Sequence, residues 1–286
     1  MKTRCMMGRY KLLVVATKYW RPGENYIEEM INSVEGKIAD GDIIVISEKA
    51  ISTASNNIVD EDNVKPSLGA KLITRFWMRI GWGYFLGPAC HMGGRLVRRL
   101  REYPLEMGSC HKQVALQHAG FFQALMFGSE GGIDGSNLAY TFVSLPLENA
   151  KGTAQQIRER VWRELGKRVC IMIVDTDKTY SFRNFHFTPR PRPIKGIQSL
   201  GGLVPYVLGR VLRTKKRATP LAVAGCAMPT ENALEIADIA NRVRGSGAGR
   251  TVWEMAERFN VKLTDVTWEM LETVKHKPIV IVRGKR

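Results

Sequence analysis

Residues 140–174 read YTFVSLPLENAKGTAQQIRERVWRELGKRVCIMIV, and this stretch indicates the fold class. Two apolar runs, Tyr140–Leu145 and Val169–Val174, have the length and composition of buried strands. Between them, Ala154–Leu165 repeats apolar residues at helical spacing and ends before a glycine. This order of strand, helix and strand predicts helices packed on a β-sheet, in an α/β or mixed α+β protein.

Similar patterns on both sides add strands and helices to this unit. Further apolar runs predict buried strands at Leu12–Ala16, Ile43–Ile46, Leu221–Val223 and Ile279–Val282. Helical patterns cover Thr230–Arg244, Arg250–Phe259 and Thr267–Lys275, with Thr230 as the N-cap of the first. We therefore expect an α+β fold, with a mixed β-sheet and flanking helices.

The segment Pro66–Gln113 differs from its surroundings because it is rich in arginine, glycine, methionine and aromatic residues and has weak strand signals. We interpret it as an inserted, largely helical subdomain or flap, 66–113, within a core formed by 1–65 and 114–286. Its stretch Phe76–Phe85 could stack on a ring or base as a flap. Such residues are more often core or interface, and a dimer interface is the favoured interpretation.

The composition is that of a globular protein with an excess of positive charge. Of the 286 residues, 44% are hydrophobic and 24% charged, which excludes a disordered chain. The formal net charge is +16. Such a charge attracts nucleic acid, anionic lipid, or small molecules that carry phosphate or carboxylate groups, and does not choose among them.

The cysteines and the apolar segments bear on the cellular compartment. The five cysteines are odd in number and widely spaced, without a C-x-x-C pair, which favours a reducing compartment. No secretory signal follows the basic start Met1–Tyr10. The most apolar stretch, Ile80–Cys90, is shorter than the roughly 20 residues that cross a bilayer. We expect a cytoplasmic protein with no membrane partner.

Two acidic motifs are candidates for metal-dependent chemistry. The glycine-rich turn Gly131–Asn137 exposes Asp134 and Ser136, and Asp175-Thr176 directly follows a predicted strand. Carboxylate and hydroxyl oxygens at strand ends and turns are the ligands that Mg²⁺ or Mn²⁺ prefers. In the alternative interpretation, Asp134 closes an Asx-turn and Asp175 caps the next element, with no metal involved.

A glycine-rich turn between two predicted helices reads RGSGAGR, Arg244–Arg250. Its unshielded backbone N–H groups, the following helix N-terminus and the flanking arginines would suit a phosphate. It is neither a Walker A loop nor a dinucleotide-binding fingerprint. A helix C-cap followed by a flexible link explains it equally well.

In order and spacing, these segments resemble the coenzyme F420-0:L-glutamate ligase family. The resemblance rests on Asp40–Ile46 with Glu48-Lys49, on Gly132–Asn137, on Asp175-Thr176, and on the closing strand Pro278–Gly284. It covers roughly 11–60, 128–185 and 235–284. It implies a glutamate-ligase-like fold with the segment 66–113 inserted.

The resemblance also implies an activity. Enzymes of this family use GTP and a divalent cation, often Mn²⁺, to attach L-glutamate to the lactyl carboxylate of a deazaflavin, in archaeal-type cofactor metabolism. For this chain it implies GTP or possibly ATP as co-substrate, Mn²⁺ or Mg²⁺ as cofactor, an anionic small-molecule substrate, and a homodimer.

The resemblance assigns binding roles residue by residue, but no catalytic residue. Asp134 and Asp175 would hold one metal ion and Thr176 a second. The nucleotide would contact Thr17, Lys18, Tyr19, Trp20, Glu48, Lys49, Asn137, Arg244, Gly245, Ser246, Gly247 and Gly249. Glu235 matches an acidic helix position upstream of the glycine-rich turn, and Arg183 is the one arginine that remains in the loop after Asp175-Thr176.

The sequence departs from the family pattern at three places. Thr53 stands where a nucleotide-contacting lysine is usual in the family. Thr179 lies in the segment that replaces the family's arginine-containing loop after Asp175-Thr176, and Leu234 replaces an acidic neighbour of Glu235. An alternative function is therefore that of a diverged paralogue that binds nucleotide or nucleic acid without ligation. Its basic surface would include Arg95–Arg101 and Lys215–Arg217.

Overall fold

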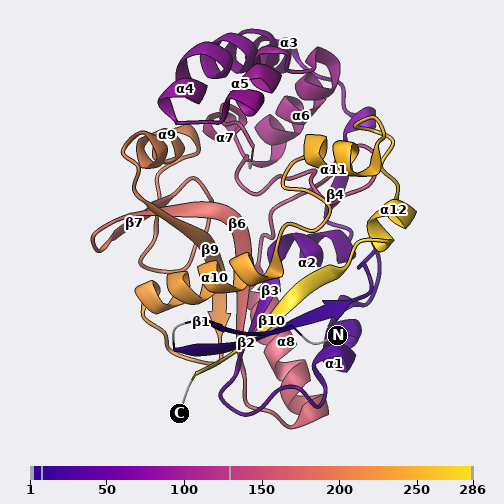
Figure 1. Cartoon of the computed structure of the whole chain (residues 1–286), viewed down its shortest axis with the longest axis vertical. Helices are drawn as coiled ribbons and strands as arrows, with labels where there is room; N and C mark the ends of the chain where they lie inside the picture. Colours follow the sequence, from indigo (N-terminus) through magenta and orange to yellow (C-terminus); the bar gives the residue numbers. More distant parts are fainter. Residues whose placement is uncertain (1–2, 8, 129, 285–286) are drawn as a thin grey trace.

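The computed structural model describes residues 3–7, 9–128 and 130–284 of the chain. This part of the chain forms a mixed eight-stranded sheet, a separate two-stranded sheet, helices on both faces of the large sheet and a helical lobe above it (Figure 1). The predicted α+β class is therefore confirmed.

The strands are β1 (Thr3–Met7), β2 (Tyr10–Thr17), β3 (Ile43–Ser47), β4 (Ile58–Asp60), β5 (Phe142–Ser144), β6 (Cys170–Phe182), β7 (Phe185–Thr188), β8 (Gln198–Ser199), β9 (Lys215–Ala224) and β10 (His276–Gly284). The helices are α1 (Tyr26–Val34), α2 (Glu48–Ala54), η1 (Glu61–Asn63), α3 (Leu68–Leu72), η2 (Ile73–Leu86), α4 (Gly87–Ala89), α5 (Gly94–Arg101), α6 (Leu105–His118), α7 (Phe121–Ala124), α8 (Ala150–Leu165), α9 (Leu203–Val211), α10 (Thr230–Arg244), α11 (Val252–Phe259) and α12 (Trp268–Glu272).

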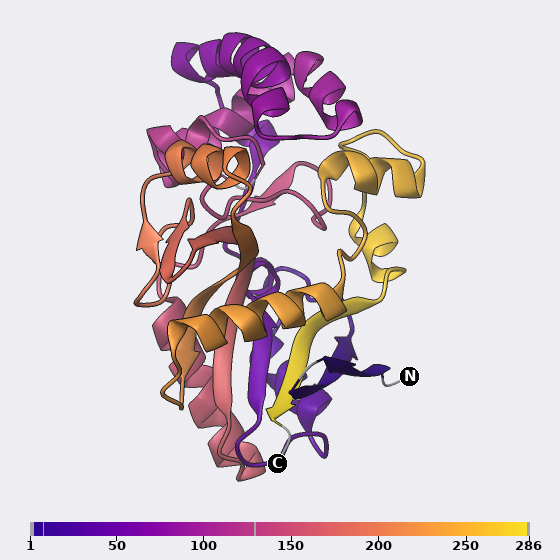
Figure 2. The ribbon, with the colours of Figure 1, turned by 60° about the vertical axis from the view of Figure 1, so that its left-hand side comes forward.

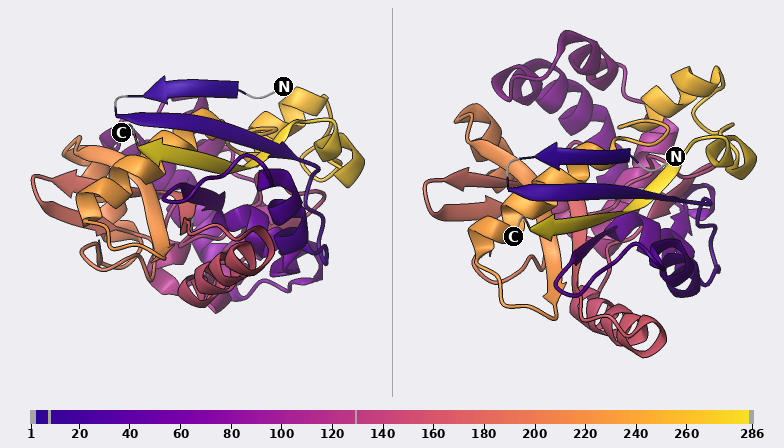
Figure 3. Two further views of the ribbon diagram at one scale, coloured as in Figure 1. Left: turned by 90° about the horizontal axis from the view of Figure 1, so that it is seen from below. Right: turned by 60° about the horizontal axis from the view of Figure 1, so that its bottom comes forward.

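The large sheet has the order β1-β2-β10-β3-β6-β7-β8, with β9 also paired to β6. Neighbouring strands are antiparallel except in the pairs β3/β6 and β7/β8. Figure 3 shows β1, β2 and β10 side by side along one edge, with the two chain termini close to them.

Both faces of the sheet are buried under helices, which explains the continuous apolar runs in its central strands. Successive strand residues point to opposite faces. Ile44 and Ile46 of β3 therefore pack with α1 and α8, whereas Val45 packs with α10. Figure 2 shows α10 crossing one face of the sheet and α8 lying along the other.

The strand register gathers several candidate residues at one edge of the sheet. Because β3 and β6 are parallel, Ser47 pairs with Val174, which brings Glu48, the first residue of α2, close to Asp175. The prediction that the strand ends before Asp175 is wrong, because β6 continues to Phe182 and Asp175 pairs with Thr219 of β9. Strand β10 runs antiparallel to β3, so its first residue, His276, lies at the same edge. In open α/β sheets, ligand sites form at the carboxyl ends of parallel strands.

The helical lobe contains α3, η2, α4, α5 and α6 and forms the upper part of Figure 1. The predicted helical character of Pro66–Gln113 is thus confirmed, although α6 continues to His118. Buried side chains such as Met78, Trp82 and Leu100 form a core of its own. Within the described residues, no helix is both long and apolar enough to cross a bilayer.

The prediction that Tyr140–Leu145 joins the same sheet as β6 is wrong. Only Phe142–Ser144 is strand, and this β5 pairs with β4 in the small sheet. The parallel neighbour of β6 is β3. In the sequence, the whole helical lobe lies between these two strands. A purely local strand–helix–strand pattern cannot indicate that long-range pairing.

Two further expectations are corrected near β9 and α10. Lys215–Arg217, expected on a basic surface, is the start of β9, and Arg217 is buried and donates to both carboxylate oxygens of Glu231. Thr230 is the first residue of α10, and its N-cap is Pro229. The Thr230 hydroxyl instead donates to the carbonyl oxygen of Lys195 at 3.1 Å.

The cysteines are not all unpaired, contrary to the expectation from their spacing. Cys170 and Cys226 form a disulfide, with their Cα atoms 5.6 Å apart. The pairing of Ile171 with Ala224 in the antiparallel strands β6 and β9 brings the two residues together across 56 positions of sequence. Cys90 and Cys110 are free.

Candidate active site

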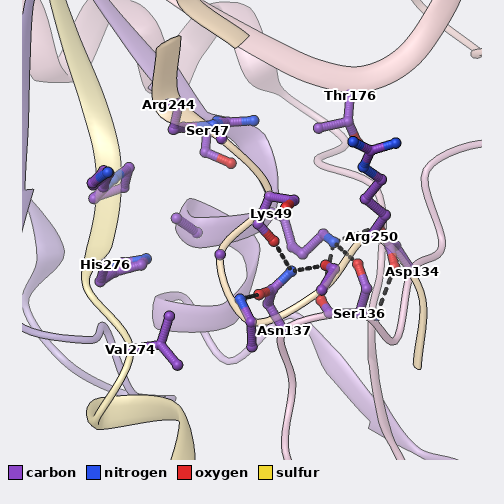
Figure 4. A pocket seen from close by; sticks show the side chains of 18 of the residues that line it. Ser47, Lys49, Asp134, Ser136, Asn137, Thr176, Arg244, Arg250, Val274 and His276 are labelled. Carbon is purple, nitrogen blue, oxygen red and sulfur yellow. Dashed lines mark hydrogen bonds and ion pairs between the residues drawn. The ribbon is translucent and has the colours of Figure 1, made fainter. Parts of the chain in front are cut away.

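A cavity of about 640 Å³ lies at the end of β3, beside the middle of β6 and the start of β10, and Figure 4 shows side chains that line it. The start of α2, the loop before β5, the glycine-rich turn after α10 and the start of β10 form its walls. Of the residues predicted to bind metal or nucleotide, it brings together Tyr19, Trp20, Lys49, Asp134, Asn137, Thr176, Arg244, Gly245, Ser246, Gly247 and Gly249.

Lys49 and Asp134 form an ion pair in the wall of this cavity (Figure 4). Lys49 Nζ also donates to the hydroxyl of Ser136 at 2.7 Å and to its carbonyl oxygen at 3.0 Å. Asp134 Oδ1 accepts from the backbone N–H of Ser136 at 2.7 Å, which is the expected Asx-turn. The turn thus fixes the carboxylate while leaving it at the cavity wall.

Arg190 is the residue that sequence reasoning missed. It is buried; its Nε donates to Asp175 Oδ2 at 2.7 Å, and its Nη2 pairs with Glu48. Its Nη1 donates to the carbonyl oxygen of Gly131 at 2.7 Å. Gly132 has φ +105°, and a Cβ on it would lie 2.6 Å from the guanidinium carbon, so glycine is required there.

The Arg190 cluster has one cation for two buried carboxylates. Burial, opposed by Arg190 and reinforced by Asp175, raises the pKa of Glu48 to about 8. Glu48 Oε1 also accepts from the backbone N–H of Leu147 at 2.8 Å. A protonated Glu48 leaves the charge of Asp175 to be balanced by Arg190 alone.

Asn137 organises the glycine-rich turn rather than projecting freely into the cavity. Its Nδ2 donates to the carbonyl oxygens of Ser246 at 3.2 Å and Gly249 at 2.9 Å, and its Oδ1 accepts from Ala248 N–H. Gly247, at φ +63°, faces this side chain, and a Cβ there would lie 2.4 Å from Asn137 Oδ1. The turn is therefore held in one conformation against the acidic motif.

Aromatic and apolar side chains form another part of the wall. Tyr19 donates from its hydroxyl to the carbonyl oxygen of Asn137 at 2.6 Å and packs against His276, with ring centroids 5.0 Å apart. Burial lowers the pKa of His276 to about 4, so its ring is neutral near pH 7. Because the carbonyl oxygen of Lys18 accepts from Nδ1 at 2.9 Å, Nε2 is left as an acceptor.

The lining is strongly positive. In the described part of the chain, seven cationic side chains line the cavity: Lys49, Lys178, Arg242, Arg244, Arg250, Lys275 and Lys277. One carboxylate, Asp134, lines it as well. Burial lowers the pKa of Arg244 to about 10, which leaves it charged at neutral pH. Such a lining favours a polyanionic ligand.

Several predicted site residues lie elsewhere. Glu48 and Asp175 are buried against Arg190, behind the lining. The Thr17 hydroxyl donates to the carbonyl oxygen of Lys18, and Lys18 forms an ion pair with Glu24. Glu235 pairs with Arg9 on the surface, and Arg183 is exposed at the tip of the β6–β7 hairpin.

The predicted metal ligands fit an ion that arrives with phosphates better than an all-protein metal cage. Among the described residues there is no cluster of three or more histidine, cysteine or acidic side chains suited to a metal. Asp134 and Thr176 face the cavity, whereas Asp175 Oδ2 accepts from Arg190 and Oδ1 from the Asp177 N–H. Mg²⁺ commonly takes one or two carboxylates together with phosphates and waters.

The basic residues considered for nucleic acid are partly engaged within the protein. Arg99 pairs with Glu257 and Arg217 with Glu231, whereas Arg98 is exposed on α5. Only part of the proposed basic surface is therefore free to meet a phosphate backbone.

Fold and site together define a mixed α+β protein with a cation-lined cavity beside two acidic motifs. The chain belongs to the F420-0:Gamma-glutamyl ligase family, whose family model matches residues 14–284. This membership implies ligase activity on small-molecule substrates in F420 biosynthesis. The chain is also similar to the Uncharacterized protein MJ1361 of Methanocaldococcus jannaschii, with 34% identity over 283 residues that cover 95% of each chain.

Proposed function

We propose that this protein is a nucleoside-triphosphate- and metal-dependent ligase. It would form an amide between L-glutamate, or a similar amine, and a carboxylate of a deazaflavin-type cofactor, with GTP as the first choice of nucleotide and ATP as the second. The observation that carries the proposal is the cavity wall, where seven cationic side chains accompany one carboxylate among the described residues. Family membership supplies the type of bond formed.

The chemistry requires an activated acid, because a free carboxylate is a poor electrophile. A carboxylate oxygen attacks the γ-phosphorus, the bond to the β-phosphate oxygen breaks, and an acyl phosphate and a nucleoside diphosphate result. The amine then attacks the acyl carbon, and inorganic phosphate leaves with the amine proton. Phosphoryl transfer depends mainly on position and on neutralised charge, which Lys49, Arg244 and Arg250 can provide at the cavity wall.

A divalent cation bound with the nucleotide would neutralise phosphate charge and orient the transferred group. Asp134 and Thr176 are the cavity-facing residues that would hold it. Asp175 would join them only if Arg190 released its carboxylate. The protein's own contribution is thus to place one carboxylate, one hydroxyl and several cations around the phosphates.

The cavity lining includes apolar and cationic side chains, which suit the base and the phosphates of a nucleotide. Tyr19, Trp20 and Leu271 offer an apolar surface for a base, and the acceptor nitrogen Nε2 of His276 lies in the same wall. The glycine-rich turn and its arginines also line the cavity and would receive the phosphates.

Calorimetric titration with GTP, GDP and ATP, with and without Mn²⁺ or Mg²⁺, tests this proposal. We expect metal-dependent binding of the triphosphate that Asp134→Ala weakens strongly and Glu235→Ala leaves unchanged. Asp175→Ala tests the shared-metal prediction separately, since this residue lies behind the wall. Absence of nucleotide binding under every metal condition would contradict the proposal and make nucleic acid the next ligand to examine.

A further inference from the structure

A second cavity, of about 570 Å³, lies at the opposite ends of the central strands. Its walls include the first residues of β3 and β6, Ile43 and Cys170, and the last residue of β10, Gly284. The second half of α8 and the turn between β9 and α10 complete these walls. In the described part of the chain, this cavity shares no lining residue with the cavity at Asp134 and His276. The proposed nucleotide site therefore does not account for it.

The lining of this second cavity is positively charged. It contains Arg158, Lys167 and Arg168, and no carboxylate among the residues that the structure describes. The guanidinium of Arg168 lies over the ring of Trp162, 5.2 Å from its centroid. Between described residues, none of the three cations forms an ion pair. A cavity with cations and no carboxylates raises the local concentration of small anions.

Arg158 is held against the turn that follows β9. Gly225 in this turn has φ +95°, and a Cβ on it would lie 2.8 Å from Cδ and 2.9 Å from Nε of Arg158. Such a Cβ would also lie 2.7 Å from the carbonyl oxygen of Val169. Glycine therefore allows the Arg158 side chain to lie directly on the turn that contains Cys226.

The disulfide between Cys170 and Cys226 forms part of the same wall. Its two halves differ in exposure, because Cys170 is buried at the start of β6 whereas Cys226 is exposed in the turn. A thiolate that enters the cavity therefore meets the Cys226 half, with Cys170 as the leaving group. Cations near a thiol favour its thiolate form, which is the attacking species.

We propose that this cavity is a thiol–disulfide exchange site for a small thiol that carries carboxylate or phosphate groups. The anionic groups of the thiol bind to Arg158, Lys167 and Arg168, and its sulfur attacks Cys226 Sγ. A bond forms between these two sulfurs, the Cys170–Cys226 bond breaks, and Cys170 leaves as a thiolate that takes up the proton lost by the incoming thiol. The incoming thiol is oxidised and Cys170 is reduced, so no further oxidant is needed.

The surroundings of the disulfide favour exchange over a purely structural role. A disulfide that only connects β6 to the turn after β9 needs neither an exposed half nor a group of cations around it. Here an exposed Cys226 and three cations without carboxylate partners line one cavity in the described part of the chain. The inference does not depend on the proposed ligase function, because the two cavities share no described lining residue.

The kinetics of disulfide reduction test this inference on the intact chain, with mercaptosuccinate as the anionic thiol and mercaptoethanol as the neutral one. Each rate is divided by the rate of the same thiol with hydroxyethyl disulfide, which removes differences in intrinsic reactivity. We expect the normalised rate for mercaptosuccinate to be about tenfold higher than that for mercaptoethanol at low salt. This ratio should fall as added salt screens the charges.

Variants of the lining test the role of the cations. The double variant Arg158→Met, Arg168→Met should remove most of the advantage of mercaptosuccinate. The matched control is Arg163→Met, an exposed arginine on the same helix outside the cavity lining, which should keep the advantage. Peptide mapping after acid quenching should find the mixed disulfide on Cys226 and a free thiol on Cys170.

The salt dependence is measured on the wild-type protein, so the test does not require the double variant to fold. Equal normalised rates for the two thiols, a ratio that neither salt nor the double variant changes, or a mixed disulfide on Cys170 would overturn the inference. Nucleotide titration is a separate measurement, and its failure would overturn the ligase proposal without affecting the exchange site.

Discussion

Arg190 shows how much of this site depends on a single buried side chain. It connects the start of α2 and the middle of β6 to the glycine turn that precedes Asp134, through Glu48, Asp175 and the carbonyl oxygen of Gly131. A buried guanidinium with three acceptors fixes all three in one arrangement. The position of the cavity wall therefore follows from a residue that does not itself line the cavity.

Replacing Arg190 should be strongly destabilising. Arg190→Met leaves the buried carboxylate of Asp175 without its cation and Glu48 without one of its hydrogen-bond partners, and we expect a loss of about 3–5 kcal/mol in the free energy of unfolding. The matched control is Arg192→Met, an exposed arginine in the same loop, with an effect within about 0.5 kcal/mol. Urea unfolding measures both; equal effects would contradict the buried cluster.

The protonation of Glu48 predicts a pH dependence of stability. Its pKa rises from the ordinary 4.5 to about 8 on folding, so between these values the folded state holds a proton that the unfolded state releases. The free energy of unfolding should therefore fall as pH rises from about 4.5 to 8. Glu48→Gln should remove that part of the decline, and Glu235→Gln, at the surface, should not. Parallel curves for wild type and Glu48→Gln would refute the assignment.

Among the connecting elements, the glycine-rich turn predicts a difference between two alanine variants. Gly245→Ala and Gly247→Ala both place a side chain at positive φ, which costs about 1–2 kcal/mol. Only the Cβ at Gly247 collides with Asn137; that at Gly245 meets nothing within 4 Å. We expect Gly247→Ala to weaken GTP binding about tenfold more than Gly245→Ala does. Titration calorimetry measures the GTP affinity of both variants. Equal losses of affinity would mean that Asn137 does not position the turn.

The strands and helices with strong periodicity could be predicted from the sequence. Ile43–Ile46 and Ile279–Val282 are buried on both faces, so their continuous apolar runs leave little alternative to a central strand. Strand β9 begins at Lys215, earlier than predicted. The prediction missed this start because two lysines and an arginine do not resemble a buried strand, and Arg217 is buried in a pair with Glu231. Charge in the sequence does not reveal a distant partner.

The sequence could indicate those residues of the cavity lining that lie in short local motifs. Asp134, Lys49 and the turn Gly245–Gly249 lie in short motifs and meet at one cavity. Arg190 could not be found in this way, since Arg192 stands two residues away in the same proline-rich context. Two acidic residues buried together require a cation, but the sequence does not show which arginine or lysine supplies it.

For the molecule as a whole, the lobe has an apolar face that no described segment covers. Leu68, Leu72, Phe76, Ile80 and Tyr84 follow one another at four-residue spacing along α3 and η2, and all are exposed. Side chains at this spacing share one helix face. Contiguous exposed apolar surface of this kind is typical of an interface.

The homodimer prediction is tested at this face. We expect the wild-type protein to sediment as a dimer and the double variant Phe76→Glu, Ile80→Glu to sediment as a monomer, because charge at an apolar interface is costly to bury. Phe185→Glu, an exposed aromatic on β7, serves as the control and should remain dimeric. A monomeric wild type would contradict the homodimer prediction. A dimeric double variant would mean that the dimer interface lies elsewhere.

The most direct test of the central claim is a crystal structure obtained with Mn²⁺ and a non-hydrolysable GTP analogue. The account predicts the triphosphate against Lys49, Arg244 and the glycine-rich turn, with an anomalous Mn²⁺ peak about 2.0–2.6 Å from the Asp134 carboxylate. A nucleotide bound in another cavity, or a metal remote from Asp134, would contradict it.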